Sequence, residues 1–553
     1  MSRSIFNRLD RFASNVSSAA AANLGKREQS GTSACGDTSE SPMAHLYYTI
    51  RVVDASTHRG LPLVYLRTTY KAVYITDSAG YVAFNEPGLM TGDPIWVTVS
   101  SYGFESPVGF LNVPGMQIHP KPGKSIEIRL NRTQVAERLY RMTGYGIYRD
   151  SVLLGKSVPI DQPVLNAKVA GSDTIQCAKF KDKLLWMWQD TDQMKFQLGN
   201  FNMTGAFTEL PDVLNADQGL NFEYFTEDHK PNEFVRKMVS INLEKQGPFP
   251  IWIDGLTVVP DDMGQERLIG HYYASGQTLG ACVERGLVVW NDKKHLFEKL
   301  AKFEGTGLGA GQLAPGGHTV YVHDDGISYA YYGKNVRVRA TFTHASDPSQ
   351  YEAFTCLATD GRWANRASNG DLIWAWVKGG KPVNYETADS LVQSGLIRPE
   401  ESPYRLKDLD SGKNIQAQSA GIAWNPFLKL WVNVFQQKFG DTPCGEIWFS
   451  TANAPEGPWT SCRKVATHHM NRDGYKNNSN DLYNPVQHYE LMREGGRHVY
   501  FSGTFVNTFS GNQWPTPYYN YNNIMYRLDL KDPSLSLPPP PPGLWGTRPN
   551  ESS

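Results

Sequence analysis

The segment SDTIQCAKFKDKLLWMWQDT, residues 172–191, decides the fold of most of this chain. It reads as two short strands: the first begins with polar residues, a turn containing Asp182 follows, and the second carries two tryptophans. The same plan, with Tyr or Trp in the second strand, recurs over residues 252–274, 318–333, 419–437 and 484–505. A ring of such sheets leaves no long exposed edge, so the repeats predict a closed five-bladed β-propeller over residues 153–531.

Upstream of the propeller, residues 44–131 alternate between apolar and polar positions in six or seven short runs, which predicts a small β-sandwich. Within TDSAGYVAF (76–84), Asp77 and Gly80 permit a tight reversal that returns the next strand to the sheet. Together with VVDASTHRGLPLVYLR (52–67), this run resembles the transthyretin-like or carboxypeptidase-regulatory-like domains. That resemblance implies an accessory module without catalysis.

Three flanking segments complete the predicted organisation. Residues 1–43 are rich in Ser, Ala, Gly and Thr and are expected to be a mobile leader. Residues 132–152 are predicted to form a helical spacer that Thr133 caps and Gly144 ends, with one apolar face made by Val135, Leu139 and Met142. Residues 532–553 contain a run of prolines and are expected to form an extended, solvated tail.

The composition supports an all-β fold and excludes several classes of partner. Aromatic residues make up 12% of the chain, beside 50 Gly and 34 Pro, which favours short strands and tight turns. Because 54 Lys and Arg balance 55 Asp and Glu, no overall field favours nucleic acid. No apolar run is long enough to span a membrane, and the N-terminus lacks the apolar core of a secretory signal. An extracellular location stays possible, so the compartment is left open, as is the oligomeric state.

The six cysteines show no spacing typical of a metal site, so neither a metal nor another cofactor is expected. Cys444 and Cys462 flank a predicted hairpin and would bridge only in an oxidising compartment; two unpaired thiols are the favoured interpretation.

Polar residues at the heads of the innermost strands are the candidate functional residues. In a propeller these strands all begin at the central axis, so their first side chains converge on one funnel. The candidates are Ser172, Asp173, Asp254, His318, Ser419, Asn484, Gln487 and His488. Asp173 and Asp254 are the sharpest, because each carboxylate heads an otherwise apolar strand, where a charge is costly without a purpose or a partner.

Three features resemble the five-bladed propeller glycosidases that act on arabinan and related furanosides: the acidic residues that open the first two blocks, WQDT (188–191) and EIWFSTANAPEGPW (446–459). The resemblance implies a glycoside hydrolase, which needs one protonated and one ionised carboxyl group. Under it, Asp173 is the base or nucleophile and Asp254 orients the sugar. Glu284 is the first candidate for the acid and Glu352 the second.

Asp190 offers a different acid, since a hairpin can return its side chain to the rim beside Asp173. Each acidic candidate also has a structural interpretation: the aspartates as caps of turn amides, and Glu284 as an ion-pair partner of Arg285. The candidate substrate-binding residues are His318, His488, Asn484, Trp188 and Arg285. Both histidines also suit hydrogen-bonded wall positions, and the spacing of Trp186 and Trp188 also suits packing between blades.

Three other functions are compatible with the sequence. One is a polysaccharide lyase, in which His318 or a tyrosine would remove the proton. Another is a non-catalytic propeller that binds a glycan or a protein through the same funnel. The third is a structural protein whose sandwich and proline-rich tail dock partners. A polysaccharide or oligosaccharide substrate in the funnel is the leading hypothesis.

Overall fold

The structure is a computed structural model that describes residues 43–543 except 195, 201–202, 228–232, 246, 248, 277–280, 305–312, 314, 359–360, 439, 441–444, 469–470, 473–474, 477–481, 508–509 and 511–514. The described residues belong to one compact unit, Glu40–Ser553. The predicted leader, apart from Met43, lies outside the described residues, as does Cys444. Cys462 carries a buried free thiol. No helix among the described residues is long and apolar enough to cross a membrane.

The first part of the chain is a seven-stranded sandwich, which confirms that element of the predicted fold class. One sheet has the order β4-β1-β7 and the other the order β3-β2-β5-β6. The strands are β1 (Tyr48–Asp54), β2 (Tyr65–Thr68), β3 (Val73–Ile75), β4 (Tyr81–Phe84), β5 (Ile95–Ser100), β6 (Met116–Ile118) and β7 (Ser125–Leu130). Their inward-facing side chains, among them Ile50, Leu66 and Val99, form a separate core.

The tight turn predicted at TDSAGYVAF is present between β3 and β4. Gly80 donates its amide to the carbonyl of Asp77 at 3.0 Å and has a φ of 78°, which a side chain would strain. The Asp77 carboxylate accepts the amides of Ala79 and Tyr81, both at 3.0 Å. The short aspartate side chain therefore fixes the reversal that brings β4 back to β1.

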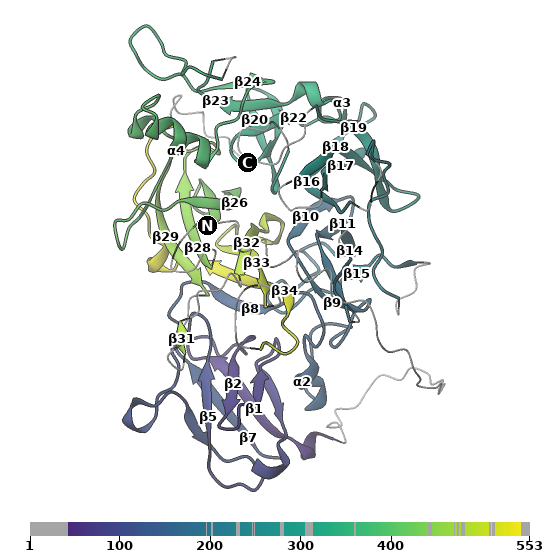
Figure 1. Cartoon of the computed structure of the whole chain (residues 1–553), viewed down its shortest axis with the longest axis vertical. Coiled ribbons are helices and arrows are strands. Elements are labelled where there is room, and N and C mark those ends of the chain that lie inside the picture. The colour runs from purple at the N-terminus through teal and green to yellow at the C-terminus, as the bar shows by residue number, and fades with distance from the viewer. Residues whose placement is uncertain are drawn as a thin grey trace. The chain divides into compact units, whose positions relative to one another are not determined.

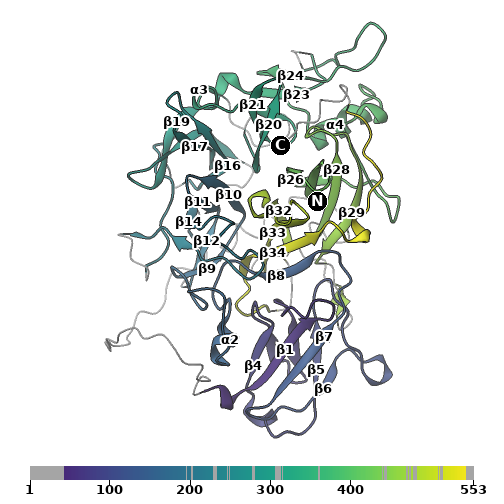
Figure 2. The ribbon, with the colours of Figure 1, turned by 180° about the vertical axis from the view of Figure 1, so that it is seen from behind.

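Five further sheets of four or five strands form the blades of a propeller, arranged around a common centre (Figures 1 and 2). Blade one contains β10 (Ile175–Phe180), β11 (Lys183–Trp188), β14 (Thr204–Thr208) and β15 (Glu223–Tyr224). Blade two contains β16 (Ile251–Pro260), β17 (Glu266–Ser275), β18 (Cys282–Asn291) and β19 (Leu296–Lys302). Blade three contains β20 (Thr319–Asp324), β21 (Ile327–Tyr332), β22 (Val336–Arg339), β23 (Glu352–Thr355) and β24 (Ala375–Lys378).

Blade four contains β26 (Ala417–Asn425), β27 (Leu430–Gln437), β28 (Glu446–Ala452), β29 (Trp459–Thr467) and β25 (Tyr404–Asp408). Blade five contains β32 (Leu482–Gln487), β33 (His498–Val506), β34 (Tyr521–Asp529) and β8 (Glu137–Arg141). Beside blade one lies a three-stranded sheet of β9 (Val169–Ser172), β12 (Thr191–Gln193) and β13 (Phe196–Asn200), and β30 (Asn471–Arg472) pairs with β31 (Tyr475–Lys476). The helices are α2 (Arg149–Leu153), α3 (Phe342–Ala345) and α4 (Tyr385–Gln393).

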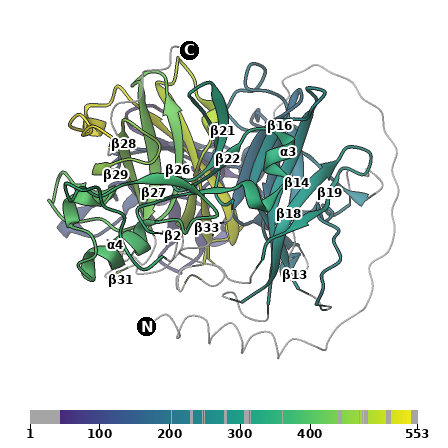
Figure 3. The ribbon, with the colours of Figure 1, turned by 90° about the horizontal axis from the view of Figure 1, so that it is seen from above.

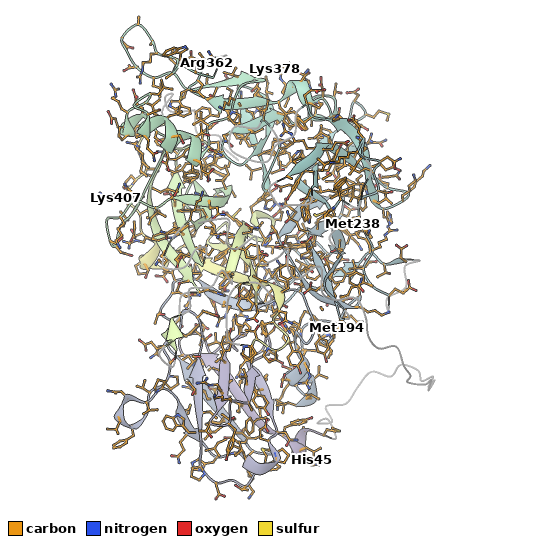
Figure 4. All side chains as sticks on the ribbon, viewed as in Figure 1. His45, Met194, Met238, Arg362, Lys378 and Lys407 are labelled. Carbon is orange, nitrogen blue, oxygen red and sulfur yellow. The ribbon has the colours of Figure 1, made fainter. Side chains whose placement is uncertain are left out.

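Apolar side chains between the sheets hold neighbouring blades together. Figure 3 shows strands of blade two and of blade four on opposite sides of the molecule. Between blades one and two, Met187, Ile253 and Leu268 pack in one core with Met238, which Figure 4 labels. The predicted all-β fold, a sandwich followed by a five-bladed propeller, is confirmed.

The helical spacer predicted over residues 132–152 is wrong for its central part. Residues Glu137–Arg141 form strand β8, which pairs antiparallel with β34 and completes blade five. All five residues are buried, so this segment has no solvent-facing side and the helical spacing of its apolar positions does not decide its structure. Only Arg149–Leu153 is helical. Because β8 precedes blade one in the chain, it closes the ring between its two ends.

The proline-rich segment also differs from the expected solvated tail. Within its described part, Leu535 is buried, and the carbonyl of Ser536 accepts Nε of Arg463 at 2.9 Å. Asn453 donates its amide to the carbonyls of Pro540 and Pro541, both at 3.0 Å. Proline carbonyls have no partners within an extended polyproline segment, so side chains of blade four can hold them.

Candidate active site at the centre of the propeller

The innermost strands of the blades surround a cavity of about 170 Å³. Blades one, two, three, four and five each contribute at least one residue to its lining, which consists of Thr174, Gln176, Gln189, Asp254, Gly317, His318, Gly421, Asn484, Pro485 and Val486. The structure thus brings together segments of the chain that lie more than three hundred residues apart. The side chain of Ser419 lies outside the described residues.

Asp173 and Asp190 lie opposite one another at a bend in one long hairpin. On one side of the bend, Ser172 of β9 pairs with Thr191 of β12. On the other side, Ile175 of β10 pairs with Trp188 of β11. Between these ladders the amide of Asp173 donates to the carbonyl of Asp190 at 2.8 Å. The bend therefore places both acids next in sequence to the cavity residues Thr174 and Gln189, although neither acid is part of the lining itself.

The Asp173 carboxylate accepts hydrogen bonds from blades one and five. Its Oδ1 accepts the amide of Thr174 at 2.6 Å, the hydroxyl of Thr174 at 3.0 Å and the hydroxyl of Tyr483 at 3.0 Å. Burial raises the pKa of Asp173, while hydrogen bonds from Tyr521, Thr174 and Tyr483 act in the opposite direction. Several donors thus stabilise the ionised form of a carboxyl group that burial would keep protonated.

The Asp190 carboxyl group is buried with less support. Its Oδ1 accepts Nε1 of Trp252, from blade two, at 2.7 Å. Burial and the nearby Asp173 carboxylate raise the pKa of Asp190 to about 8, although the hydrogen bond from Trp252 lowers it. Asp190 therefore keeps its proton to a higher pH than an ordinary aspartate, and its carboxyl group has fewer hydrogen-bond donors than that of Asp173.

Asp254 is held in blade two by a local irregularity of β16. Gly255 has a φ of 60°, and the pairing with β17 shifts register between Asp254 and Thr257. The amide of Gly255 donates to Oδ1 at 2.9 Å, and the amide of Gly317 donates to Oδ2 at 2.8 Å. Gln176 of blade one also donates to Oδ1, at 2.6 Å. Burial raises the pKa of Asp254. The hydrogen bonds from the backbone amides of Gly317 and Gly255 and the positive charge of His318 lower it, but burial has the larger effect.

The charges of the three aspartates all influence Tyr273 of blade two. Burial raises the pKa of the Tyr273 hydroxyl, and the charges of Asp254, Asp173 and Asp190 raise it further, in that order. Acidic side chains from blades one and two thus act on one phenol. Three other aromatic residues near the acids, Tyr273, Tyr483 and Tyr521, were missed as site residues. Trp252 had a sequence signal, because it stands two residues before Asp254 and shares its face of the strand.

His318 lines the cavity with both ring nitrogens held by acceptors. Its Nδ1 lies 2.8 Å from the carbonyl oxygen of Gln487, and its Nε2 lies 3.0 Å from Oε1 of Glu490. Burial alone would lower the pKa of His318, but the Glu490 carboxylate and the backbone carbonyls of Gln487 and Cys177 together outweigh it, and the pKa is raised. A ring that donates from both nitrogens is an imidazolium, which has no lone pair to accept a proton.

Two other predicted residues of blade five differ in their access to the cavity. Asn484 lines it and donates to the hydroxyl of Thr174 at 2.8 Å. His488 is fully buried, with Nε2 2.8 Å from the hydroxyl of Ser502 and its ring 5.3 Å from that of Trp186. Burial and the positive charge of His318 hold the pKa of His488 well below its usual range. His488 is therefore a neutral wall residue behind the cavity.

Glu284 lies on β18, the third strand of blade two, away from the cavity lining. Its carboxylate accepts Nζ of Lys299 and the hydroxyl of Tyr272, both at 2.6 Å, and the amide of Glu244 at 2.8 Å. Burial would raise the pKa of Glu284, but Lys299 and Tyr272 lower it. Glu284 is therefore ionised and paired, which does not suit a general acid. The second candidate, Glu352 on β23, is paired with Arg337 at 2.7 Å.

Arg285 and Trp188 are not part of the cavity lining. The Arg285 guanidinium lies 5.5 Å from the ring centre of Phe303. Trp188 is completely buried, with its ring 5.0 Å from Phe222 and 5.3 Å from Tyr224. It belongs to a core that blades one and five share, which fits the packing between blades that its spacing also allowed.

Among the described residues, no group of three or more His, Cys, Asp or Glu side chains is placed to hold a metal ion. No family model matches the sequence, and no curated protein matches it.

Solved structures that resemble the chain include glycoside hydrolases. An exo-β-1,3-galactanase from Phanerochaete chrysosporium is 9% identical, with a TM-score of 0.35 over 73% of this chain and 67% of that chain. An endo-arabinase from Bacteroides thetaiotaomicron is 11% identical, with a TM-score of 0.29 over 66% of this chain and 98% of that chain. A GH43_1 enzyme from Xanthomonas citri is 10% identical, with a TM-score of 0.29 over 66% and 93%. At these identities and scores, the chemistry of the funnel itself is the basis for a functional assignment.

Proposed function

We propose that the chain is a glycoside hydrolase that cleaves a polysaccharide or oligosaccharide in the funnel of the propeller. The observation that supports this proposal is the unequal pair formed by Asp173 and Asp190. Hydrolysis of a glycosidic bond needs one carboxyl group that is protonated and one that is ionised. Neighbouring carboxyl groups whose surroundings separate their pKa values take these two roles.

In the proposed mechanism Asp190 is the general acid. Its raised pKa, about 8, keeps a proton available for the leaving oxygen at neutral pH. Asp173, with donors from Thr174 and Tyr483, is the ionised partner that activates water or attacks the sugar. Asp254 is fixed by the amides of Gly255 and Gly317, and its role is to orient a sugar hydroxyl in the cavity.

The geometry gives less support to a lyase. Lyase chemistry needs a base that removes a carbon-bound proton, and His318 has both ring nitrogens facing acceptors. Burial raises the pKa of Tyr483 and of Tyr521 well above the usual value, so neither phenol is a base at neutral pH. A binding module would not need two buried carboxyl groups with different proton affinities.

The test is a screen of the purified full chain against arabinan, β-1,3-galactan, xylan and polygalacturonate, with reducing ends and unsaturated products both measured. New reducing ends without unsaturated products support a hydrolase. Unsaturated products would mean a lyase. If no polymer in a broad panel is cleaved, and the chain still binds one of them, the proposal of a hydrolase is overturned in favour of a binding propeller.

A further inference from the structure

A second cavity, of about 730 Å³, lies where the sandwich meets blades one and five. Its walls come from β1 and the following turn, the β3–β4 turn, β8, residues 157–159 and β34. It shares no lining residue with the funnel cavity, whose volume is about 170 Å³. Its volume is within the range of roughly 300–1,000 Å³ typical of ligand pockets, which often occur where domains meet.

A balanced network of four charged side chains supports one side of this cavity. Glu137 accepts Nε of Arg59 at 3.2 Å and a terminal nitrogen of Arg527 at 2.5 Å. Arg527 also donates to Asp217 at 2.9 Å, and Arg59 donates to the carbonyl of Asp217 at 2.6 Å. Arg59, Glu137 and Arg527 line the cavity. Because two cations alternate with two anions, the network creates no strong field of either sign.

The opposite side combines planar polar groups with aromatic rings. Arg51 and Tyr81 both line the cavity, and the Arg51 guanidinium lies 5.7 Å from the ring centre of Tyr81. Arg51 pairs with Glu127 at 3.3 Å, but its Nε is buried without a hydrogen-bond partner among the described residues. Tyr148, which also lines the cavity, donates to the carbonyl of Gln218 at 2.7 Å. A buried donor without an acceptor is costly to the fold.

We propose that this cavity is a second binding site, which takes a short neutral oligosaccharide. Guanidinium and carboxylate groups fixed in one network present paired donors and acceptors, which match the neighbouring hydroxyl groups of a sugar. The partly exposed ring of Tyr81 supplies a flat surface for the apolar face of a sugar ring. The balance of charge disfavours phosphate or sulfate. The choice of ligand class rests on the proposed function, since a glycosidase that holds its polymer at a second point raises the local concentration of substrate.

The test uses the full chain and two substitutions of Ser157, a cavity residue with an exposed side chain. Ser157→Trp places an indole in the cavity, and Ser157→Ala is the matched control. Each protein also carries Asp173→Asn, so that the sugars are not cleaved during the titration. Arabinotriose and β-1,3-galactotriose are titrated by calorimetry, with a glucuronate-containing trisaccharide as the charged comparison. We expect two equivalents of a neutral trisaccharide to bind the chain with the natural Ser157 and the alanine variant, and one to bind the tryptophan variant. Arg51→Leu should weaken the second site about tenfold.

A further variant separates the two sites. Thr174→Trp fills the funnel, so it should abolish cleavage. It should still bind one equivalent of sugar in the second cavity, which is the equivalent that Ser157→Trp prevents from binding. If natural chain and Ser157→Trp bind the neutral sugars equally, or if the charged sugar binds the second site more tightly, the proposed site is wrong. If the chain cleaves a polymer but binds only one equivalent of trisaccharide, in the funnel, the second site is wrong and the proposed hydrolase function still stands. If the chain binds a trisaccharide, Ser157→Trp abolishes that binding, and no polymer is cleaved, the hydrolase function is wrong and the second binding site still stands.

Discussion

Trp252 donates its indole Nε1–H to Oδ1 of Asp190 over 2.7 Å, from blade two to blade one. This hydrogen bond stabilises the ionised form of Asp190 and so lowers its pKa, against the larger effects of burial and the Asp173 carboxylate. The contact is the point at which the packing of two blades controls the proton on a candidate catalytic acid. The alkaline limit of activity should therefore depend on this indole.

Trp252→Phe should move the alkaline limb of the pH–activity profile to higher pH. In the natural chain, activity should fall as pH rises through about 8, because Asp190 loses its proton there. Without the indole donor the pKa of Asp190 rises further, so the acid stays protonated to a higher pH. The measurement is kcat/KM against pH for both proteins on one cleaved oligosaccharide. An unchanged alkaline limb would remove Asp190 from the role of acid.

Asp173→Asn should abolish cleavage without lowering thermal stability. An amide can neither activate water nor attack the sugar, so we expect activity to fall by at least about 10²–10⁴-fold. The buried carboxylate is costly to the fold, and its pKa is raised by that burial, so its removal should leave Tm unchanged or higher. Asp182→Asn, in the exposed turn of the same hairpin, is the matched control and should keep full activity. A fully active Asp173→Asn variant would exclude Asp173 from the mechanism.

Glu284→Gln should affect stability and leave turnover unchanged. Its carboxylate accepts Lys299, Tyr272 and a backbone amide, so replacement by a neutral amide should cost about 1–3 kcal/mol of unfolding free energy at pH 7. Because the pKa of Glu284 is lowered in the fold, this stabilisation is present above the usual glutamate pKa and is lost as pH falls through the lowered value. The difference between the two proteins in urea unfolding should therefore shrink at acid pH. A large loss of activity at unchanged stability would return Glu284 to the active site.

The fold could be predicted further than the site. Alternation and turn residues such as Asp77 and Gly80 are local, and they identified the sandwich and the repeated blades. Strand β8 was misread because its structure depends on β34, which follows it in the chain by nearly four hundred residues. Asp173 precedes inner strand β10, so topology alone could place it near the centre. Asp254 is instead the fourth residue of β16 and lines the cavity at the irregularity beside Gly255. Glu284 looked equally suitable, because nothing local shows that Lys299 neutralises it.

The conformation of Gly255 links the backbone of blade two to the position of Asp254. Its φ of 60° is unfavourable for a residue with a side chain, and a Cβ there would lie 3.3 Å from the ring of Tyr332. Gly255→Ala should therefore cost about 1–2 kcal/mol of stability. It should also displace the amide that donates to Oδ1 of Asp254. If Asp254 orients the sugar as proposed, KM should rise more than kcat falls. Gly264→Ala, at a φ of 77° in an open turn of the same blade, is the control: it carries similar backbone strain, but kinetics should not change. Equal kinetic effects of the two substitutions would mean that strain in blade two, and not the Asp254 contact, controls activity.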